Sequence, residues 1–414
     1  MEKLAINGGK PVRKTPLPKR NNFGEEEKEA AIRVLDKVIA SGSGLDRYGG
    51  VETDAYEKEF AEYFGTKFAT AVSSGTASIH TAIAALNLEP GSEIITTPIT
   101  DNGTLMPMIF QQCIPVLADV DYKTLNLSPE SVEKNITERT KAIIVVHLAG
   151  MPADMDKIMK IAKKHKLFVI EDCAQAHGAV YKNKFVGSIG DMGCFSMMGS
   201  KHTTSGGQGG MVLTNTEDLY WKAKRFADRG KPFGTKESGC IIAGLNYRMT
   251  DLEAAIGRVQ LKRLDKVRKN RYKVYSELKE LFKKELSAFR LWENLPKTEP
   301  NPWFCFIHID NKKIKEDNSV VSEALRAEGL YVGAHYTKPM TSSKWLLERN
   351  TLGSSQLPWT LPGVRDITYE GTCPNAEKAL LDHLTFYMNE SWKKSEITQT
   401  LKAFKKVENY YLKK

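Results

Sequence analysis

The chain of 414 residues is 41% hydrophobic and 27% charged, and its formal net charge is +10. This length exceeds what one compact core holds, so we expect two domains of ordinary globular composition. No stretch reaches the roughly 18 apolar residues of a membrane-spanning helix, and we find neither a signal peptide nor a nucleic-acid-binding motif. The six cysteines form no CxxC pair, which argues against a zinc site or a disulfide framework. We therefore predict a cytoplasmic protein with no metal, no membrane association and no nucleic-acid partner.

The first half of the chain has the pattern of a parallel sheet. Residues 1–20 are rich in proline, glycine and lysine and predict an extended arm, and 25–41 has a helical pattern. Short β-branched runs then alternate with amphipathic stretches, as in βαβ units with helices on both faces of a mostly parallel sheet. The expected strands are 68–72, 93–97, 115–118, 142–147, 168–171, 193–197 and 210–214. The expected helices are 76–88, 104–112, 129–135 and 154–165.

A long helix separates this part of the chain from the rest. We expect it to begin at Thr250-x-x-Glu253, a capping box, because such a box satisfies the first free backbone donors of a helix. The helical pattern continues to about Leu286. Beyond it we expect strands at 304–309 and 384–388 and helices at 319–328 and 395–411. The predicted organisation is an arm (1–20), a large α/β domain (21–255) and a small C-terminal α+β domain (256–414).

The segment FSMMGSKHTTSGGQGGM, residues 195–211, places one lysine in a loop of glycines and hydroxyl side chains. Lys201 has no other lysine within fifteen residues on either side. Glycines let a backbone approach a ligand closely, and hydroxyls can donate to an anion. A lysine amine in such a pocket can form a Schiff base with an aldehyde cofactor. The alternative is a surface lysine in a flexible loop.

Two further segments lie at the carboxyl ends of expected strands, where open α/β sheets bind their ligands. Ser73-Ser74-Gly75-Thr76 follows one strand and begins a helix, so its free N–H groups can hold a phosphate; a plain capped turn is the alternative. Another strand ends in Glu171 and Asp172, and a carboxylate there can pair with a protonated pyridine nitrogen. Strand alternation directs these two acids to opposite faces, so only one can face a ligand; an N-cap aspartate is the alternative.

A lysine for an aldehyde, an acid for a ring nitrogen and a cradle for a phosphate are the contacts that pyridoxal phosphate requires. With these residues in this order, the sequence resembles the DegT/DnrJ/EryC1/StrS family of pyridoxal-phosphate-dependent sugar aminotransferases. Further matching segments are INGGKP, SSGTASIHTAIAALNLEPGSEIITTPIT, IPVLADVDYKTLNLSP, TKAIIVVHLAGMPADMD, VIEDCAQAHGAVYKNKFVGSIGD, GLNYRMTDLEAAIGRVQL and CPNAE. The resemblance implies the fold of the fold-type I aspartate aminotransferases, with a mostly parallel seven-stranded sheet.

The resemblance also implies roles for individual residues. Lys201 corresponds to the Schiff-base lysine, Asp172 to the partner of the pyridine nitrogen and Gln175 to the residue beside the ring hydroxyl. The residues that correspond to phosphate ligands are Gly75, Thr76, Ala77 and Ser196. The expected cofactor is therefore pyridoxal 5′-phosphate.

Four more residues are candidates for the site. Asn246 matches the asparagine that reaches the cofactor phosphate of a neighbouring subunit, which implies a homodimer with shared active sites. Arg248 either holds the local backbone or binds an anion. His335 and Tyr336 lie where the small domain can overhang the cleft, so they are candidates for substrate contact.

The chain departs from the family at two places. After the TPIT segment the family commonly has an aromatic residue that stacks on the cofactor ring, and this chain has Asp101, Asn102 and Gly103. Either another side chain covers that face of the ring, or the stacking is absent. The KHTTSGGQGG loop is also one residue longer than the family's commoner version. Both departures affect the expected substrate and leave the expected cofactor unchanged.

Sequence and resemblance together predict an aminotransferase that moves an amino group from glutamate or glutamine to a keto-sugar, with a nucleotide-linked sugar favoured, or to a keto-cyclitol. Some relatives that dehydrate sugars have histidine at the lysine position, so Lys201 favours transamination. The alternatives are a dehydratase or aromatising eliminase of the same family, and a cofactor-binding regulator without turnover.

Overall fold

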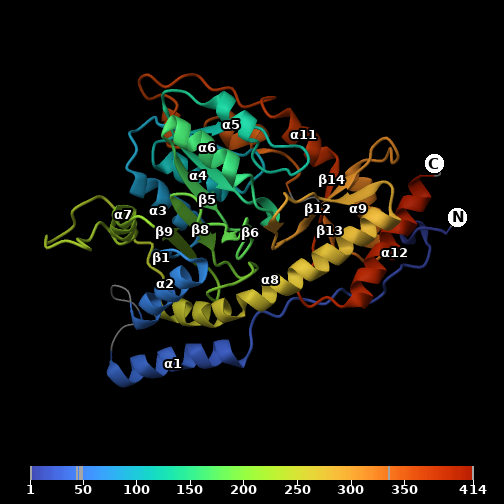
Figure 1. The fold of residues 1–414 in the computed structure, drawn as a ribbon, viewed down its shortest axis with the longest axis horizontal. Helices are drawn as coiled ribbons and strands as arrows, with labels where there is room; N and C mark the ends of the chain where they lie inside the picture. Colours follow the sequence, from blue (N-terminus) through green and yellow to red (C-terminus); the bar gives the residue numbers. More distant parts are fainter. Residues whose placement is uncertain (1, 43–44, 46–49, 334–335, 413–414) are drawn as a thin grey trace.

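The computed structural model describes residues 2–42, 45, 50–333 and 336–412, and its centre is a seven-stranded sheet (Figure 1). The order of the strands is β1 (Phe68–Val72), β9 (Gly210–Thr214), β8 (Met192–Ser196), β5 (Phe168–Asp172), β4 (Thr140–Val146), β2 (Glu93–Thr96) and β3 (Ile114–Leu117). Only β9 pairs antiparallel with its neighbours. The predicted mostly parallel sheet is therefore confirmed.

Both faces of this sheet are covered by helices, because its central strands are apolar on both sides. In β4, Ile143 and Val145 pack into one core cluster while Ala142 and Ile144 pack into another. The helices of the first cluster are α2 (Val51–Phe64), α5 (Pro129–Asn135), α6 (Met155–His165) and α8 (Asp251–Glu285). The helices of the second cluster are α3 (Gly75–Leu86), α4 (Asn102–Phe110) and α7 (Glu217–Ala227).

The long helix α8 links the large sheet to a second sheet, as Figure 1 shows. Thr250 and Glu253 form the predicted capping box at its start. The second sheet has the order β10 (Phe289–Leu291), β12 (Cys305–Ile309), β14 (His383–Phe386) and β13 (Val332–Gly333). The helices that follow α8 are α9 (Asn318–Ala327), α10 (Lys344–Leu347), α11 (Pro374–Leu381) and α12 (Lys394–Tyr411). A third, small sheet joins β11 (Thr298–Glu299), β6 (Val180–Tyr181) and β7 (Lys184–Phe185).

One hydrophobic core cluster combines residues from both large parts of the molecule. Leu105 and Val146, near the large sheet, share it with Phe306 and Phe386 of the second sheet. The two sheets are therefore packed together, and the division at 255/256 remains a prediction. No described helix has both the length and the apolar composition that are needed to cross a membrane.

Several elements were not predicted. Helices α2 and α7 are missing from the expected set, although α2 buries Tyr56, Phe60 and Phe64 at helical spacing. The short strands β10 and β13 were also missed, because two or three residues carry too little alternation to be recognised.

The N-terminal arm packs closely against the second sheet and its helices. Leu4 is fully buried in the shared core, and the 3₁₀ turn Ala5–Asn7 follows it. Glu328 accepts hydrogen bonds from the backbone of Ala5 (2.8 Å) and Val12 (3.0 Å) and pairs with Lys406. The arm is therefore fixed in place by a buried side chain and by hydrogen bonds, unlike an extended segment that only lies on the surface.

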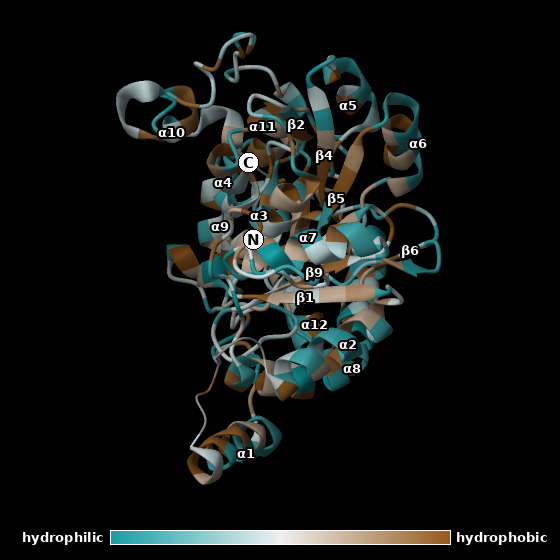
Figure 2. Ribbon diagram, turned by 90° about the vertical axis from the view of Figure 1, so that its left-hand side faces the viewer, coloured by the Kyte–Doolittle hydropathy of each residue, from teal (hydrophilic) through white to brown (hydrophobic). Residues whose placement is uncertain are grey.

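Helix α1 (Glu25–Ser41) has two apolar faces. Ala30 and Val34 pack against Ala255 of α8. On the other side Ile32, Leu35 and Ile39 are exposed, and 79% of Ile39 is accessible. Figure 2 shows α1 at the lower edge of the molecule, with several of its residues in the hydrophobic colour.

Candidate active site

A cavity of about 210 Å³ lies at the carboxyl ends of the large sheet's strands. From the large sheet, Ser74 and Asp101 follow β1 and β2, and Asp172 and Ser196 are the last residues of β5 and β8. Two aromatic side chains come from segments beside the second sheet: Trp303 precedes β12 and Tyr336 follows β13. This is the edge at which open α/β sheets bind ligands.

The N-terminus of α3 forms one wall of the cavity. Ser74 is extended and accepts a hydrogen bond from the Ala77 N–H at 3.0 Å, so it caps the helix. A Cβ atom on Gly75 would lie only 2.6 Å from the Cβ of Ser196, so glycine lets the first turn approach the end of β8. The backbone donors of that turn and the Ser196 hydroxyl can together bind an anion.

Asp172, at the end of β5, is 5% exposed and faces the same cavity. It accepts hydrogen bonds from the Thr104 hydroxyl at 2.8 Å and from the Ala174 N–H at 3.0 Å. Burial raises the pKa of this carboxyl, while those two donors and the nearby Lys201 favour its charged form. A cationic ring nitrogen bound in the cavity would form an ion pair with the Asp172 carboxylate and stabilise its charge.

Lys201 is 6% exposed, and its amine reaches the cavity. Burial lowers the pKa of this amine to about 8, against the opposing attraction of Asp172 and Asp101. The Nζ atom lies 3.5 Å from the centre of the Trp303 ring, and within the described chain it makes no hydrogen bond or ion pair. About a tenth of the amine is then neutral at pH 7, far more than for an ordinary lysine, which makes it available as a nucleophile and a base.

Gln175 connects the two sheets beside the cavity. Its side-chain oxygen accepts from the Ala149 N–H at 2.7 Å, and its amide donates to the Tyr336 hydroxyl at 2.8 Å. Tyr336 adopts a left-handed backbone conformation with φ of 58°. His335, the other predicted substrate contact, lies outside the described residues.

Three predicted residues do not line this cavity. Ala77 is the third residue of α3, and its N–H donates to the Ser74 cap. Asn246 is exposed on the segment between α7 and α8, at a bridge with Asp228. Arg248 forms an ion pair with Asp228 and lines a larger, open cavity of about 530 Å³ between α2 and α7. That larger cavity contains neither Lys201 and Asp172 nor the N-terminus of α3, so we place the functional site in the smaller one.

Thr104 and Trp303 are among the residues of the cavity that were not predicted from the sequence. Thr104 lies three residues after the α4 cap Asp101, whose carboxylate accepts from the Gly103 N–H at 2.8 Å. Trp303 comes from far along the chain, and no local pattern marks it. At the position where the family commonly has an aromatic, Asp101 begins a helix, and the aromatics of the cavity are contributed by Trp303 and Tyr336.

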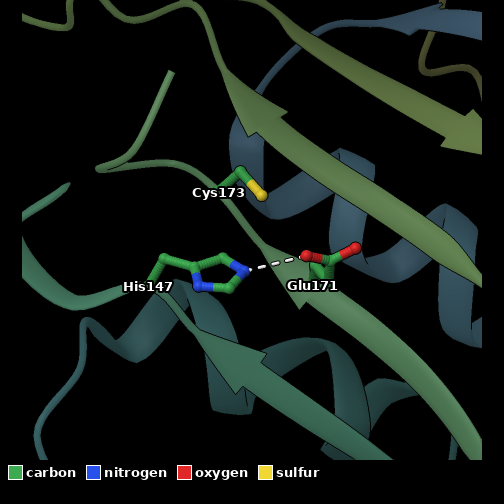
Figure 3. A group of neighbouring side chains, drawn as sticks. All are labelled: His147, Glu171 and Cys173. Carbon is green, nitrogen blue, oxygen red and sulfur yellow. Dashed lines mark hydrogen bonds and ion pairs between the residues drawn. The ribbon is translucent and has the colours of Figure 1, made fainter. Parts of the chain in front are cut away.

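On the other face of the sheet, Glu171 lies beside His147 and Cys173, a group that could be mistaken for a metal site (Figure 3). Glu171 accepts from the N–H groups of Gly187, Ile189 and Gly190, at 2.7–2.9 Å, and from His147 Nε2 at 2.9 Å. His147 Nδ1 accepts from the Ala153 N–H, so Nε2 carries the proton. Burial raises the pKa of the Cys173 thiol well above its usual value. The oxygen and nitrogen atoms that could bind a metal already take part in hydrogen bonds, and the thiol is protonated. The group therefore anchors the backbone of residues 187–190 and of Ala153.

Replacement of Glu171 by alanine should therefore destabilise the fold. Four donors, two of them on buried residues, would lose their acceptor, and we expect the free energy of unfolding to fall by roughly 3–5 kcal/mol. Urea denaturation of the cofactor-free chain measures this, with the exposed Glu89→Ala as the control. A loss below about 1 kcal/mol, or a stability of the native chain that rises with added Zn²⁺, would contradict the anchoring role.

The cavity fits pyridoxal phosphate on its own geometry. It combines a buried amine at Lys201 that makes no hydrogen bond or ion pair among the described residues, a buried carboxylate at Asp172 and a helix N-terminus that Gly75 keeps open. Together with the strand order of the large sheet, these features define the class of fold-type I pyridoxal-phosphate-dependent transferases.

Comparison with known proteins gives the family. The model of the DegT/DnrJ/EryC1/StrS aminotransferase family matches residues 25–396, and the chain belongs to that family. It is 33% identical over 323 residues to GDP-perosamine synthase of Escherichia coli O157:H7, covering 77% of this chain and 85% of the relative. It is 32% identical over 387 residues to a putative L-glutamine:3-amino-2,3-dideoxy-scyllo-inosose aminotransferase of Streptoalloteichus tenebrarius, covering 86% and 87%. Among solved structures, the aminotransferase from Psychrobacter cryohalolentis has a TM-score of 0.82 at 30% identity, covering 96% and 99%. The protein is therefore an enzyme, a pyridoxal-phosphate-dependent aminotransferase.

Proposed function

We propose that the enzyme transfers the amino group of glutamate or glutamine to a keto-sugar or a keto-cyclitol. One observation carries the proposal: the Lys201 amine, with its lowered pKa, shares a small cavity with the Asp172 carboxylate and the N-terminus of α3. The named relatives support both acceptor classes, since one makes GDP-perosamine and the other acts on an aminated inosose.

Each residue of the cavity has a separate task in this proposal. Lys201 would join the cofactor aldehyde, and its Nζ atom, once released, would take the proton from the α-carbon of the donor. Asp172 would pair with the ring nitrogen, held in place by its two hydrogen-bond donors. The first turn of α3 and Ser196 would hold the phosphate, and Gln175 would lie beside the ring hydroxyl. When bound, the cofactor supplies an electron sink for the carbanion that this proton transfer leaves.

Product analysis tests the proposal. The purified enzyme would be incubated with ¹⁵N-labelled glutamate or glutamine and with a panel of nucleotide-linked keto-sugars and keto-cyclitols, and the products analysed by mass spectrometry. We expect the label to appear in one acceptor class. Loss of water from the acceptor without incorporation of label would instead identify a dehydratase, which is the alternative from the same family. No change in any acceptor over a broad panel would favour a cofactor-binding regulator.

We further propose that the active site is completed by a second copy of the chain. The segment between α7 and α8 projects from the body of the molecule (Figure 1), and it exposes Asn246 together with Ile242 and Leu245. The outer face of α1 also exposes apolar side chains. Exposed apolar surface of this kind is typical of an interface. In the dimer, Asn246 would reach the cofactor phosphate of the partner.

Mixed dimers test this arrangement. Lys201→Ala and Asn246→Ala should each be inactive alone, but dimers that contain one of each have one intact site. Random reassociation of equal amounts should therefore restore about a quarter of native activity, because half of the dimers are mixed and each has one working site of two. Activity that stays at the level of the separate variants would show that Asn246 serves its own subunit.

A cytoplasmic location is proposed on the chemistry of the cysteines. Five of the six are buried, and all six are unpaired, which suits a reducing compartment.

A further inference from the structure

Inside the cavity, the Lys201 side chain lies against the indole ring of Trp303, which belongs to the segment just before β12. The Nζ atom of Lys201 lies 3.5 Å from the centre of the indole ring, well within the distance at which an aromatic face attracts a cation. The indole is itself held at both ends. Its Nε1–H donates to the Ser200 carbonyl at 3.0 Å, and its backbone N–H donates to the Ala149 carbonyl at 2.9 Å.

The backbone on both sides of this contact is held by one ionic network, which we name the arm clamp: Arg20, Glu390 and Arg271. Arg20 donates to the carbonyls of Lys201 and His202 and, at 2.5 Å, to Glu390. Glu390 also accepts from Arg271 at 2.9 Å. Arg271 is 2% exposed and donates to the Pro302 carbonyl at 2.7 Å and the Trp303 carbonyl at 3.4 Å. The clamp therefore joins the lysine loop to the segment that carries the indole.

We propose that Trp303 is a positioning residue whose ring holds the Lys201 ammonium in the cavity whenever the lysine is not joined to the cofactor, and that the arm clamp keeps the ring and the lysine together. The inference deepens the proposed function, because the lysine must be released and recaptured in each cycle. A Lys201 side chain that is already held on the Trp303 ring loses less conformational entropy than a freely moving one when it returns to the position from which it reacts. The N-terminal arm, through Arg20, then contributes to the site directly.

The pKa of the Lys201 amine depends on the groups that surround it. The charged groups that raise this pKa are Asp172 of β5 and Asp101, the α4 cap. Three more titratable or charged groups face Lys201, from the segment after β5, the lysine loop and the arm: His177, His202 and Arg20. The indole adds an attraction for the protonated form alone. Loss of the ring should therefore lower the pKa of the amine further, whereas mere entry of water would raise it.

The test is the pH dependence of amine labelling in the cofactor-free, full-length chain. Reductive methylation of Lys201, followed by peptide mass spectrometry, reports the fraction of neutral amine at each pH. We expect a midpoint near 8 in the native chain and a fall of about 0.4–1.5 pH units in Trp303→Leu. Trp303→Phe, which retains a weaker ring, should fall between the two. Trp221→Leu, at a tryptophan of α7 outside this cavity, is the matched control and should keep the native midpoint.

The arm clamp is tested by combination with Arg20→Gln. If the clamp keeps the ring and the lysine together, the shift caused by Trp303→Leu should shrink in the Arg20→Gln background, since coupled residues are not additive. An unchanged or raised midpoint in Trp303→Leu would overturn the role of the ring, and an equal shift in both backgrounds would overturn the role of the clamp. Because labelling needs no turnover, these outcomes are separate from failure of the proposed transamination.

Discussion

Replacement of Lys201 by alanine should reduce turnover by about 10⁴-fold or more, since the general-base contribution alone is roughly 10²–10⁴-fold and the covalent attachment is lost with it. The amine is the only lysine nitrogen that lines the cavity among the described residues. We expect the variant to bind the cofactor through its phosphate and ring contacts without a covalent bond. Single-turnover kinetics with the amino donor and borohydride trapping measure the two effects.

The controls for this result lie in the same loop. In the native enzyme, borohydride should fix the cofactor to the peptide that carries Lys201 and to no other. Lys201→Arg keeps the positive charge in the cavity but cannot be trapped, so it separates loss of charge from loss of the reactive amine. Turnover that survives in the alanine variant, or a cofactor fixed to another lysine, would overturn the assignment of the site.

Replacement of Asp172 by asparagine should lower turnover by about 10²–10³-fold, comparable to the loss of one preorganised electrostatic contact in other enzymes. Asparagine has the same shape, and its oxygen can still accept from the Ala174 N–H. It cannot keep a ring nitrogen protonated, because it carries no charge. We therefore expect the variant to stay folded, with a free energy of unfolding within about 1 kcal/mol of native, while the amino-donor half-reaction slows.

The matched control for this prediction is Thr104→Val. It removes a donor to the same carboxylate and keeps the charge. We expect a smaller loss of activity than in Asp172→Asn, of roughly 10–10²-fold, because a hydrogen bond to a charged group contributes roughly 1.5–3 kcal/mol. Equal losses in the two variants would mean that orientation of the carboxylate, and not its charge, limits the reaction.

Most elements of the large sheet were predicted from the sequence. Its strands and the helices α3 to α6 and α8 are long enough to show apolar alternation or helical periodicity, whereas α2 and α7 were missed despite a similar length. Alternation also predicted that Glu171 and Asp172 face opposite ways, and the structure has Asp172 in the cavity and Glu171 among backbone donors on the other face. The pattern alone could not tell which of the two faces the cavity.

The parts of the site that escaped prediction depend on contacts between distant segments. Trp303 reaches Lys201 from the second sheet, and Arg20 reaches the same loop from the arm. Neither position has a local signature, because both contacts exist only after the two sheets have packed together. Resemblance to the family supplied the roles of single residues, which composition and periodicity could not.

The two adjacent acids of β5 have a consequence for folding. Glu171 accepts hydrogen bonds from three backbone N–H groups and from His147, and Asp172 faces the cavity. Sliding the strand by a single position would therefore exchange the environments of both acids at once. In a misaligned strand, each of the two carboxylates would lie on the wrong face of the sheet, without the groups that pair with it in the native fold. Recovery of cofactor binding after denaturation is therefore a sensitive reporter that this central strand has found its native alignment.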